Sequence, residues 1–395
     1  MKVLVLGGAG AMGRHLCRAL VDMDCIEQVR VAGIDNEAGQ TFCASLDGRA
    51  TYLSLDVTDD AALVGELEDV DLVANTTGPF FKLAKPILEA AIASGIDYID
   101  ICDDVEPTAS MLELHAEAEQ AGITAIVGMG ASPGLTNLLA RQAVEALDTV
   151  EAIDTSWDLD MTITVDDGFA AAPTGMNTPA AIVHWMHCCS GRAPITKNGR
   201  VICVRTLEPV DLDFQHDTTV VGWSVAHPEP VTLALTYPEL TDCSNFMTGR
   251  KEIFELLRPI RDRIDKGTLT IETAAAMLVT HYNLGAPMSK DAEAARRSGR
   301  KTQTPLLAAM AKGKLDGRSA TSVAAMHNLP FGGMGASTGI PAAIAIRMIA
   351  EGAITEKGVF PPENVVPTAA FFEHFASYVP NTMSSDIVRS QVQYT

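Results

Sequence analysis

Two patterns of apolar and polar residues divide the chain near residue 150. Before that point, short apolar runs alternate with stretches whose apolar residues recur at the spacing of one helix face. We expect the runs to be buried strands and the amphipathic stretches to be helices. Repeated strand–helix units predict an α/β fold with a doubly wound parallel sheet. The expected strands are 2–6, 28–34, 50–55, 71–75, 97–101 and 124–127, and the expected helices are 13–23, 37–46, 60–67, 83–94 and 108–121.

Beyond residue 150, strand patterns follow one another with few helices between them, which predicts a second α+β domain with a mostly antiparallel sheet. Asn198-Gly199 lies between two such runs and indicates a β-hairpin. We expect a first domain of residues 1–135 completed by 338–395, with residues 136–337 as the inserted second domain. The expected strands of the insert are 150–159, 193–196, 201–205, 210–214, 218–226 and 231–236, and its expected helices begin at 178, 251 and 271.

The first loop of the chain has the glycine spacing of a phosphate-binding turn. Gly8, Gly10 and Gly13 form G-x-G-x-x-G between an expected strand and an expected helix, the context in which this motif binds dinucleotides. The glycines permit a tight turn, a close approach to a pyrophosphate and close packing of helix on strand. The helix start offers N–H groups to the phosphates. The pattern predicts a Rossmann domain in which Ala11 and Met12 also contact the cofactor.

An acidic residue follows the second strand where dinucleotide-binding domains contact the ribose. Asp35 ends this strand, about 20 residues beyond the glycine motif. A carboxylate there accepts hydrogen bonds from the ribose hydroxyls of NAD and repels the 2′-phosphate of NADP. We therefore expect NAD as the cofactor, with NADP disfavoured. Asp56 and Val57, after the third strand, are expected beside the adenine. The alternative is a glycine turn that binds no dinucleotide.

The loop after the fourth strand is the next candidate contact, because strand ends form the ligand edge of an open α/β sheet. Gly78 is small and Pro79 is stiff, which suits a loop that lies along the nicotinamide ribose. Thr76 completes this expected cofactor contact, and Phe80 is expected to face the substrate.

Composition narrows the class of protein. The 395 residues include 29 basic and 50 acidic ones, a net charge of −21, which argues against nucleic acid as a partner. The same charge permits a cationic substrate, or serves solubility alone. The 8 cysteines form no C-x-x-C pair, so we expect reduced thiols in a cytoplasmic protein. Neither a long apolar run nor a secretory leader pattern is present, so we expect no membrane partner.

Three blocks of the sequence resemble one enzyme family. The first joins 75–81 with 98–104, the second is 130–137, and the third runs from 338–343 to 358–363. Together they resemble the saccharopine dehydrogenase (reductase) family, a group similar to carboxynorspermidine dehydrogenases and lysine 6-dehydrogenases. The resemblance covers nearly the whole chain.

The resemblance implies a Rossmann domain completed by C-terminal helices and an inserted domain that carries substrate contacts and a dimer interface. It implies hydride transfer between a nicotinamide and the C–N bond of an amino-acid-derived, opine-type substrate in a homodimer. Two places depart from the family pattern. The second strand ends in Ile34-Asp35-Asn36 rather than in the Ser-Arg suited to NADP, and the basic stretch 287–318 looks longer. The rival functions are dehydrogenation of a free amino acid or polyamine, and sensing of NAD(H) without turnover.

Oxidation of an amine needs a base, and two carboxylates follow the fifth strand at the ligand edge. Asp103 is the predicted base, with Asp104 beside it. This role requires a pKa raised towards neutrality by burial or by a neighbouring charge. The alternative is that the pair caps the next helix. Lys82 is a second catalytic candidate, as an acid or a carboxylate partner, with a plain surface lysine as its alternative.

The second block supplies the expected substrate anchor. Ser132, Pro133 and Gly134 precede a helix whose N–H groups suit a carboxylate, and Asn137 suits the nicotinamide amide or the substrate. The alternative is a structural turn.

A cluster at His184, His187 and Cys188 has the residue types of a metal site. The sequence offers no second ligand cluster with matching spacing, and hydride transfer needs no metal. We therefore expect packing or a subunit contact here, and no metal.

Overall fold

The computed structural model describes residues 1–159, 180–214, 219–282, 304–380 and 382–395. The chain divides into two compact units: unit 1 is Met1–Leu135 with Gly335–Phe375, and unit 2 is Thr136–Met334 with Ala376–Thr395. The expected helix start at Thr178 and most of the basic stretch, 287–303, lie outside the described residues.

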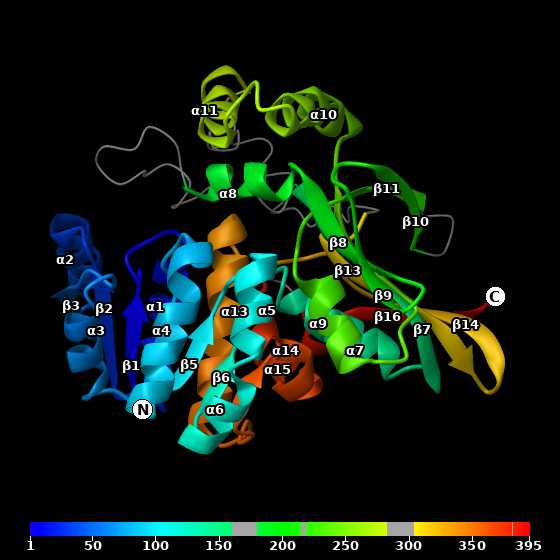
Figure 1. Cartoon of the computed structure of the whole chain (residues 1–395). Helices are drawn as coiled ribbons and strands as arrows, with labels where there is room; N and C mark the ends of the chain where they lie inside the picture. Colours follow the sequence, from blue (N-terminus) through cyan, green and yellow to red (C-terminus); the bar gives the residue numbers. More distant parts are fainter. Residues whose placement is uncertain (160–179, 215–218, 283–303, 381) are drawn as a thin grey trace. The chain divides into compact units, whose positions relative to one another are not determined.

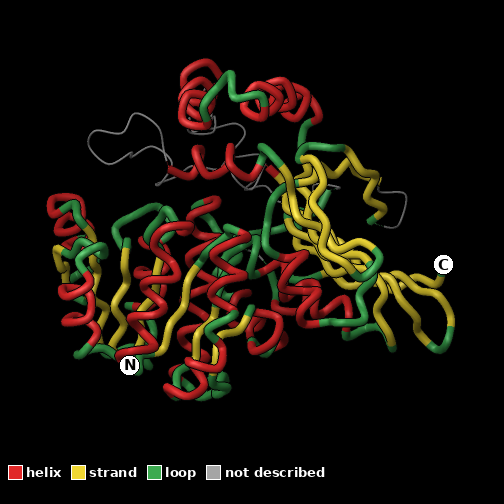
Figure 2. The backbone as a smooth tube through the Cα atoms, viewed as in Figure 1, coloured by secondary structure: helices red, strands yellow, loops and turns green. Residues whose placement is uncertain are grey.

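Unit 1 alternates strands and helices along the chain (Figures 1 and 2). Its strands are β1 (Lys2–Leu6), β2 (Gln28–Gly33), β3 (Ala50–Ser54), β4 (Leu72–Asn75), β5 (Asp97–Asp100), β6 (Thr124–Ile126) and β15 (Gly358–Phe360). Its helices are α1 (Gly13–Leu20), α2 (Asn36–Ala44), α3 (Asp60–Leu67), α4 (Phe80–Ser94), α5 (Val105–Leu112), α6 (His115–Ala121), α13 (Gly333–Ala350), α14 (Pro362–Val365) and α15 (Thr368–Ala376).

The strands of unit 1 form a parallel 7-stranded sheet in the order β15-β6-β5-β4-β1-β2-β3, which confirms the predicted fold class. Leu4 and Leu6 of β1 are fully buried in one core with Ile87 and Leu88 of α4. Continuous apolar strands of this kind follow from burial on both faces. The direction of strand succession reverses between β1 and β4, and ligands bind at such a point.

Helix α13 packs against the start of α1. A Cβ at Gly335 would lie 2.8 Å from the Ala11 carbonyl oxygen, and a Cβ at Gly339 only 2.3 Å from that of Met12. Because these two glycines have no side chain, α13 can pack closely against the backbone at the start of α1, where the glycine loop ends. Among the described helices, α13 is the one long and apolar enough to cross a membrane, but 72% of its span is buried, as in a core helix.

Unit 2 is built on a 9-stranded mixed sheet. Its strands are β7 (Thr149–Asp158), β8 (Arg192–Lys197), β9 (Arg200–Arg205), β10 (Pro209–Asp213), β11 (Thr219–Ser224), β12 (Asp242–Thr248), β13 (Leu307–Leu315), β14 (Arg318–Met326) and β16 (Arg389–Tyr394). Its helical elements are α7 (Leu135–Val144), α8 (Ala180–Cys188), α9 (Glu229–Thr236), α10 (Lys251–Asp265), α11 (Ile271–Tyr282) and η2 (Ser384–Asp386).

The main path of this sheet runs β10-β11-β12-β7-β13-β14-β16, with β8 and β9 beside β12. Only β12 and β7 pair in parallel in the described sheet, so the prediction of a mostly antiparallel sheet is confirmed. The predicted hairpin is also confirmed, since β8 and β9 pair across Asn198 and Gly199, whose φ angles are 51° and 68°.

Two sequence expectations for unit 2 differ from the structure. The stretch 231–236, predicted as a strand, is part of helix α9. Pro230 in the first turn favours a helix start, and a short apolar run does not by itself separate strand from helix. Residues 376–395 were expected to complete the first domain, but they group with unit 2 because β16 pairs with β14.

Candidate active site

The glycine loop of unit 1 is so tight that side chains at its key positions would meet backbone. A Cβ at Gly13 would lie 2.5 Å from the Gly7 carbonyl oxygen, and a Cβ at Gly10 would lie 3.0 Å from the same atom. The Gly10 N–H donates to that oxygen at 2.8 Å, and the Arg14 N–H donates to the Gly10 carbonyl at 3.0 Å. The loop therefore presents backbone at the start of α1, as a diphosphate requires.

The loop after β4 lies against the glycine loop. The Thr76 N–H and hydroxyl both donate to the Leu6 carbonyl, at 2.9 and 2.7 Å. A Cβ at Gly7 would lie 2.8 Å from the Thr77 hydroxyl oxygen, which is buried without a hydrogen-bond partner among the described residues. An unsatisfied buried hydroxyl beside a glycine cradle fits a bound dinucleotide. Gly78 and Pro79 follow, exposed and joined by a cis peptide bond.

Asp35 is fixed at the end of β2. Its Oδ1 accepts a 3.0 Å hydrogen bond from the Ala38 N–H and so caps α2. Tyr52 supports this turn, because its hydroxyl donates to the Gly33 carbonyl at 2.7 Å and a Cβ at Gly39 would lie 1.9 Å from its ring. The carboxylate is partly exposed at the position predicted for the ribose contact.

The adenine candidates lie after β3. The Oδ1 of Asp56 accepts hydrogen bonds from the Thr58 hydroxyl at 2.7 Å and the Thr58 N–H at 2.9 Å, which lower the pKa of this exposed carboxyl. Val57 packs against the core of unit 1. Their contact with adenine stays a prediction.

A buried chain of hydrogen bonds links the ends of β4 and β5. The Thr77 N–H donates to Asn75 Oδ1 at 2.9 Å, and Asn75 Nδ2 donates to the Tyr98 hydroxyl at 3.3 Å. That hydroxyl donates to Asp100 Oδ2 at 2.8 Å. Sequence reasoning assigned no role to Asn75, Tyr98 or Asp100. The available signal was the presence of polar residues at the ends of otherwise apolar strands.

Asp100 extends this chain to the end of β6. Its Oδ1 accepts from the Cys102 N–H at 3.0 Å and from the Gly128 N–H at 2.7 Å. Burial raises the pKa of Asp100 to about 6 against the opposing effect of these bonds, and the charge of Asp103 adds to the rise. One buried carboxyl therefore fixes the loops after β5 and β6.

The predicted catalytic residues lie beside this network. Asp103 and Asp104 are partly exposed after β5, and the Asp104 side chain makes no capping hydrogen bond to α5 although it is the N-cap residue. Lys82 is exposed on α4, with its ammonium 5.7 Å from the Phe81 ring centroid, which favours the surface-lysine alternative. Phe80 packs partly against the core of unit 1.

The loop that carries the predicted carboxylate anchor is closed on itself. The Gly130 N–H donates to the Pro133 carbonyl at 3.0 Å, and a Cβ at Gly134 would lie 2.0 Å from the Gly130 carbonyl oxygen. Ser132 is partly exposed and precedes a cis peptide bond. A Cβ at Gly130 would lie 3.1 Å from the Thr338 methyl group, so the second and third sequence blocks meet in unit 1.

Asn137 belongs to unit 2. Its Nδ2 donates to the Thr232 hydroxyl at 3.2 Å, and the residue is fully buried. This contact favours the structural alternative, and the predicted role in ligand binding stays a prediction.

The described residues contain no group of three or more His, Cys, Asp or Glu side chains arranged to hold a metal ion. In the cluster considered from the sequence, His184 Nε2 lies 3.1 Å from the Cys188 sulfur, and His187 is exposed.

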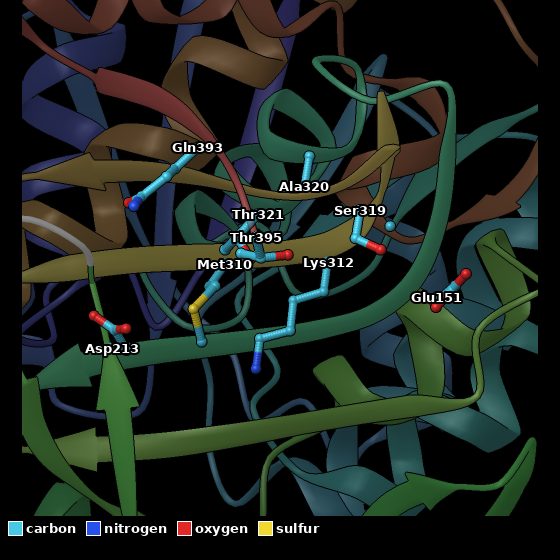
Figure 3. Close-up of a pocket in the computed structure, with 10 residues that line it drawn as sticks. Glu151, Asp213, Met310, Lys312, Ser319, Ala320, Thr321, Gln393 and Thr395 are labelled. Atoms are coloured by element: carbon cyan, nitrogen blue, oxygen red, sulfur yellow. The ribbon is translucent and has the colours of Figure 1, made fainter. Parts of the chain in front are cut away.

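A cavity of about 470 Å³ lies on the sheet of unit 2 (Figure 3). Figure 3 shows Met310 and Lys312 on β13, with Asp213 from β10 and Gln393 from β16 nearby. None of the predicted site residues lines this cavity, so it adds no support to them.

Comparison with known proteins gives sequence matches of different extent. Residues 3–126 match the family described as the saccharopine dehydrogenase NADP binding domain. The chain is 22% identical to carboxyaminopropylagmatine dehydrogenase of Synechocystis over 93% of both proteins. It is 31% identical to saccharopine dehydrogenase (NADP+, L-glutamate-forming) of Pyricularia oryzae over 36% of this chain, but this match spans only 30% of that protein.

The fold has a solved counterpart. Saccharopine dehydrogenase (L-Glu forming) from Saccharomyces cerevisiae matches 99% of both chains with a TM-score of 0.67 at 17% identity, which shows a shared fold. Residues 3–126, which match the family model, contain the glycine cradle, Asp35 and the loop after β4. Residues 3–126 therefore match an NAD(P)-binding domain of the saccharopine dehydrogenase type, and over its whole length the chain resembles saccharopine dehydrogenase-like NAD(P)-dependent oxidoreductases, which act on C–N bonds.

Proposed function

We propose that the chain transfers a hydride between NAD and the C–N bond of an amino-acid-derived, opine-type secondary amine. The resemblance to saccharopine dehydrogenase-like oxidoreductases supports the reaction type, and the glycine cradle together with Asp35 supports the cofactor. The observation that carries the proposal is the position of Asp35, a carboxylate fixed at the end of β2 in a sheet of Rossmann order.

Asp35 favours NAD although the matched family is named for NADP. The 2′-phosphate of NADP would lie close to a carboxylate whose position is set by α2 and Tyr52. Two unit negative charges about 4 Å apart repel each other by about 1 kcal/mol even in water-like surroundings. A ribose hydroxyl in the same place gains a hydrogen bond to a charged acceptor.

The remaining residues have separable roles in this proposal. The dinucleotide, when bound, supplies the group that accepts or donates the hydride. The backbone at Gly8–Gly13 would hold its phosphates, and the loop of Thr76–Pro79 would lie along the nicotinamide ribose. Asp103 would take the proton from the substrate nitrogen, which requires its carboxylate form when the amine is bound as ammonium. Backbone N–H groups after Ser132 would hold the substrate carboxylate.

A second candidate substrate is a carboxylated polyamine. The relative that covers 93% of the chain is named for a carboxyaminopropyl derivative of agmatine, a substrate with cationic groups. The net charge of −21 favours the approach of such a cation.

We further propose that the protein is a homodimer, which light scattering of the purified chain would test.

The test is a change in nicotinamide absorbance with NAD or NADP and a panel of opines, free amino acids and carboxylated polyamines. Activity with opines and NAD supports the proposal, and activity with polyamines alone selects the second candidate. Preference for NADP would remove the proposed role of Asp35. Calorimetry with the oxidised and reduced forms of both cofactors provides an independent check, because absence of any binding heat would contradict the cofactor site itself.

A further inference from the structure

Unit 2 contains a sulfur held between two imidazoles, in a cluster that the proposed reaction does not use. His184 and Cys188 lie one turn apart on α8, with Nε2 3.1 Å from the sulfur. His227, just before α9, is hydrogen-bonded to the same thiol. Its ring stacks on Trp157 with centroids 5.5 Å apart, and its Nδ1 lies 3.6 Å from Glu229 Oε2. The order sulfur, imidazole, carboxylate is that of an activated nucleophile.

The carboxylate of this cluster is anchored. Glu229 is fully buried, and its Oε1 accepts hydrogen bonds of 2.9 Å from the Thr136 hydroxyl and from Asn245 Nδ2. These donors favour the ionised carboxylate. An ionised Glu229 carboxylate 3.6 Å from Nδ1 stabilises the imidazolium form of His227. An imidazolium next to a thiol in turn favours the thiolate.

The pKa shifts agree with this charge pattern. Burial opposes the charged imidazole, but the interactions with Cys188 and with the nearby Glu229 carboxylate outweigh it and raise the pKa of His227. Burial also opposes the thiolate, but the charge and hydrogen bond of His184, together with His227, lower the pKa of Cys188. The adjacent Cys189 shows the contrast, because burial and the nearby Cys188 raise its pKa well above the ordinary value.

We propose that Cys188 is a nucleophilic thiolate held by His184 and by the His227–Glu229 pair, and that it is a modification site for peroxides. The thiolate sulfur attacks one oxygen of hydrogen peroxide, an S–O bond forms, and the O–O bond breaks. The sulfur is oxidised by two electrons to a sulfenic acid, and the peroxide is reduced. Hydroxide leaves and becomes water by taking the proton of the His227 imidazolium.

Access restricts the reagent. The Cys188 residue is 4% exposed, whereas His184 beside it is partly exposed. This burial favours a molecule the size of peroxide over bulky alkylating reagents. The structure also supplies an internal reference, since Cys203 on β9 is an exposed thiol outside the cluster.

In the test, the intact protein is treated with limiting hydrogen peroxide. It is then unfolded in the presence of a cyclic dione, a reagent that reacts with sulfenic acid and so labels any oxidised cysteine. Peptide mass spectrometry identifies which cysteine carries the label. We expect Cys188 to be oxidised at least about tenfold faster than Cys203 near pH 6, where an ordinary thiol is almost fully protonated. Faster oxidation of Cys203, or no adduct on Cys188, would overturn the proposal. This comparison needs no variant.

Two substitutions test the cause. His227→Asn should slow oxidation of Cys188 about tenfold and make it rise with pH as for an ordinary thiol. His184→Asn, at a partly exposed position, provides a milder change if the first variant does not fold. The ultraviolet absorbance of the thiolate, taken as wild type minus Cys188→Ser, reports the charge state without any need for access. An unchanged difference spectrum in both histidine variants would contradict the assigned role of the imidazoles.

Discussion

The Tyr98 hydroxyl donates a 2.8 Å hydrogen bond to Oδ2 of Asp100, two residues further along β5, and both side chains are buried. The same carboxyl accepts from the Cys102 and Gly128 N–H groups, so it joins the ends of β5 and β6 in unit 1. The hydrogen bonds of this carboxyl stabilise the loops, but burial of its charged form costs free energy because the carboxylate loses its contact with water. That balance makes Asp100 sensitive to pH, which gives the first prediction.

Asp100→Asn should change the pH dependence of stability. Burial raises the pKa of Asp100 from 3.8 to about 6 in the folded chain. Its contribution to stability is therefore complete below about pH 4 and is lost as pH rises through about 6, a change on the order of 3 kcal/mol. The variant lacks this loss. Its free energy of unfolding relative to wild type should rise by that amount between about pH 4 and pH 7, as measured by urea denaturation.

Asp154→Asn is the matched control, because burial also raises the pKa of Asp154 to about 6, but in unit 2. Both variants should shift the stability curve, but only Asp100→Asn should weaken NADH binding. In Asp100→Asn, the new side chain directs its Nδ2 donor at the Tyr98 hydroxyl. That hydroxyl already accepts a hydrogen bond from Asn75 Nδ2, so the two donors compete for it. Parallel stability curves for wild type and Asp100→Asn would rule out this account.

Asp35→Arg should shift cofactor preference towards NADP. The guanidinium replaces a charge that repels the 2′-phosphate by one that attracts it, so we expect the ratio of NADP to NAD efficiency to rise at least about tenfold. Steady-state kinetics with both cofactors measures this ratio.

The chain supplies a near-identical control for the loss of the helix cap. Asp59 caps α3 by accepting from the Ala62 N–H at 3.1 Å, as Asp35 caps α2. Asp59→Arg should lower stability by about 1 kcal/mol, as Asp35→Arg does, without changing cofactor preference. Equal cofactor ratios in the two variants would show that Asp35 is only a cap.

The parallel sheet of unit 1 could be predicted from sequence because its signals are local. Each strand is a continuous apolar run, and each loop after it carries glycine, proline or an acidic residue. In unit 2, β13 and β14 were missed although Asp316-Gly317 between them is a hairpin signal, with φ angles of 52° and 71°. These strands are rich in alanine, which has low strand propensity, and their stability comes from pairing with β7 and β16.

The candidate site was predicted only in part for a similar reason. A glycine motif and a strand-end aspartate have fixed sequence spacing, so Gly13 and Asp35 could be singled out. The link from Asn75 through Tyr98 to Asp100 joins separate strands, and only the sheet order brings these residues together. The meeting of His227 with Cys188 has no local signal either, since the two residues come from different elements.

Gly339→Ala should weaken cofactor binding from outside the glycine loop. The added Cβ would lie 2.3 Å from the Met12 carbonyl oxygen and 2.9 Å from the Leu16 nitrogen, so the start of α1 or the helix α13 must move. We expect a loss on the order of 2 kcal/mol in stability and about tenfold weaker NADH binding. Thermal unfolding and calorimetry measure the two effects.

Gly65→Ala in α3 is the control for helix propensity. Apart from the neighbouring backbone of the helix itself, no atom lies within 4 Å of the Cβ it would add, so this change should stabilise the chain by about 1 kcal/mol and leave NADH binding unchanged. If Gly339→Ala also stabilises the chain, the close packing of α13 on α1 is not required for the loop.

Asp103→Asn should lower turnover without weakening NADH binding. The amide cannot accept the substrate proton, so we expect turnover to fall by about a hundredfold or more while the cofactor dissociation constant stays the same. Removing the Asp103 charge also removes one contribution that raises the pKa of Asp100. The pH at which stability is lost through Asp100 should therefore be slightly lower in the variant than in wild type. This shift would verify that the Asp103 side chain lies near Asp100, as in the structure.

Glu106→Gln is the control, because Glu106 is an exposed carboxylate in the first turn of α5 and its substitution should leave turnover unchanged. Equal turnover in wild type and both variants would remove Asp103 from the reaction.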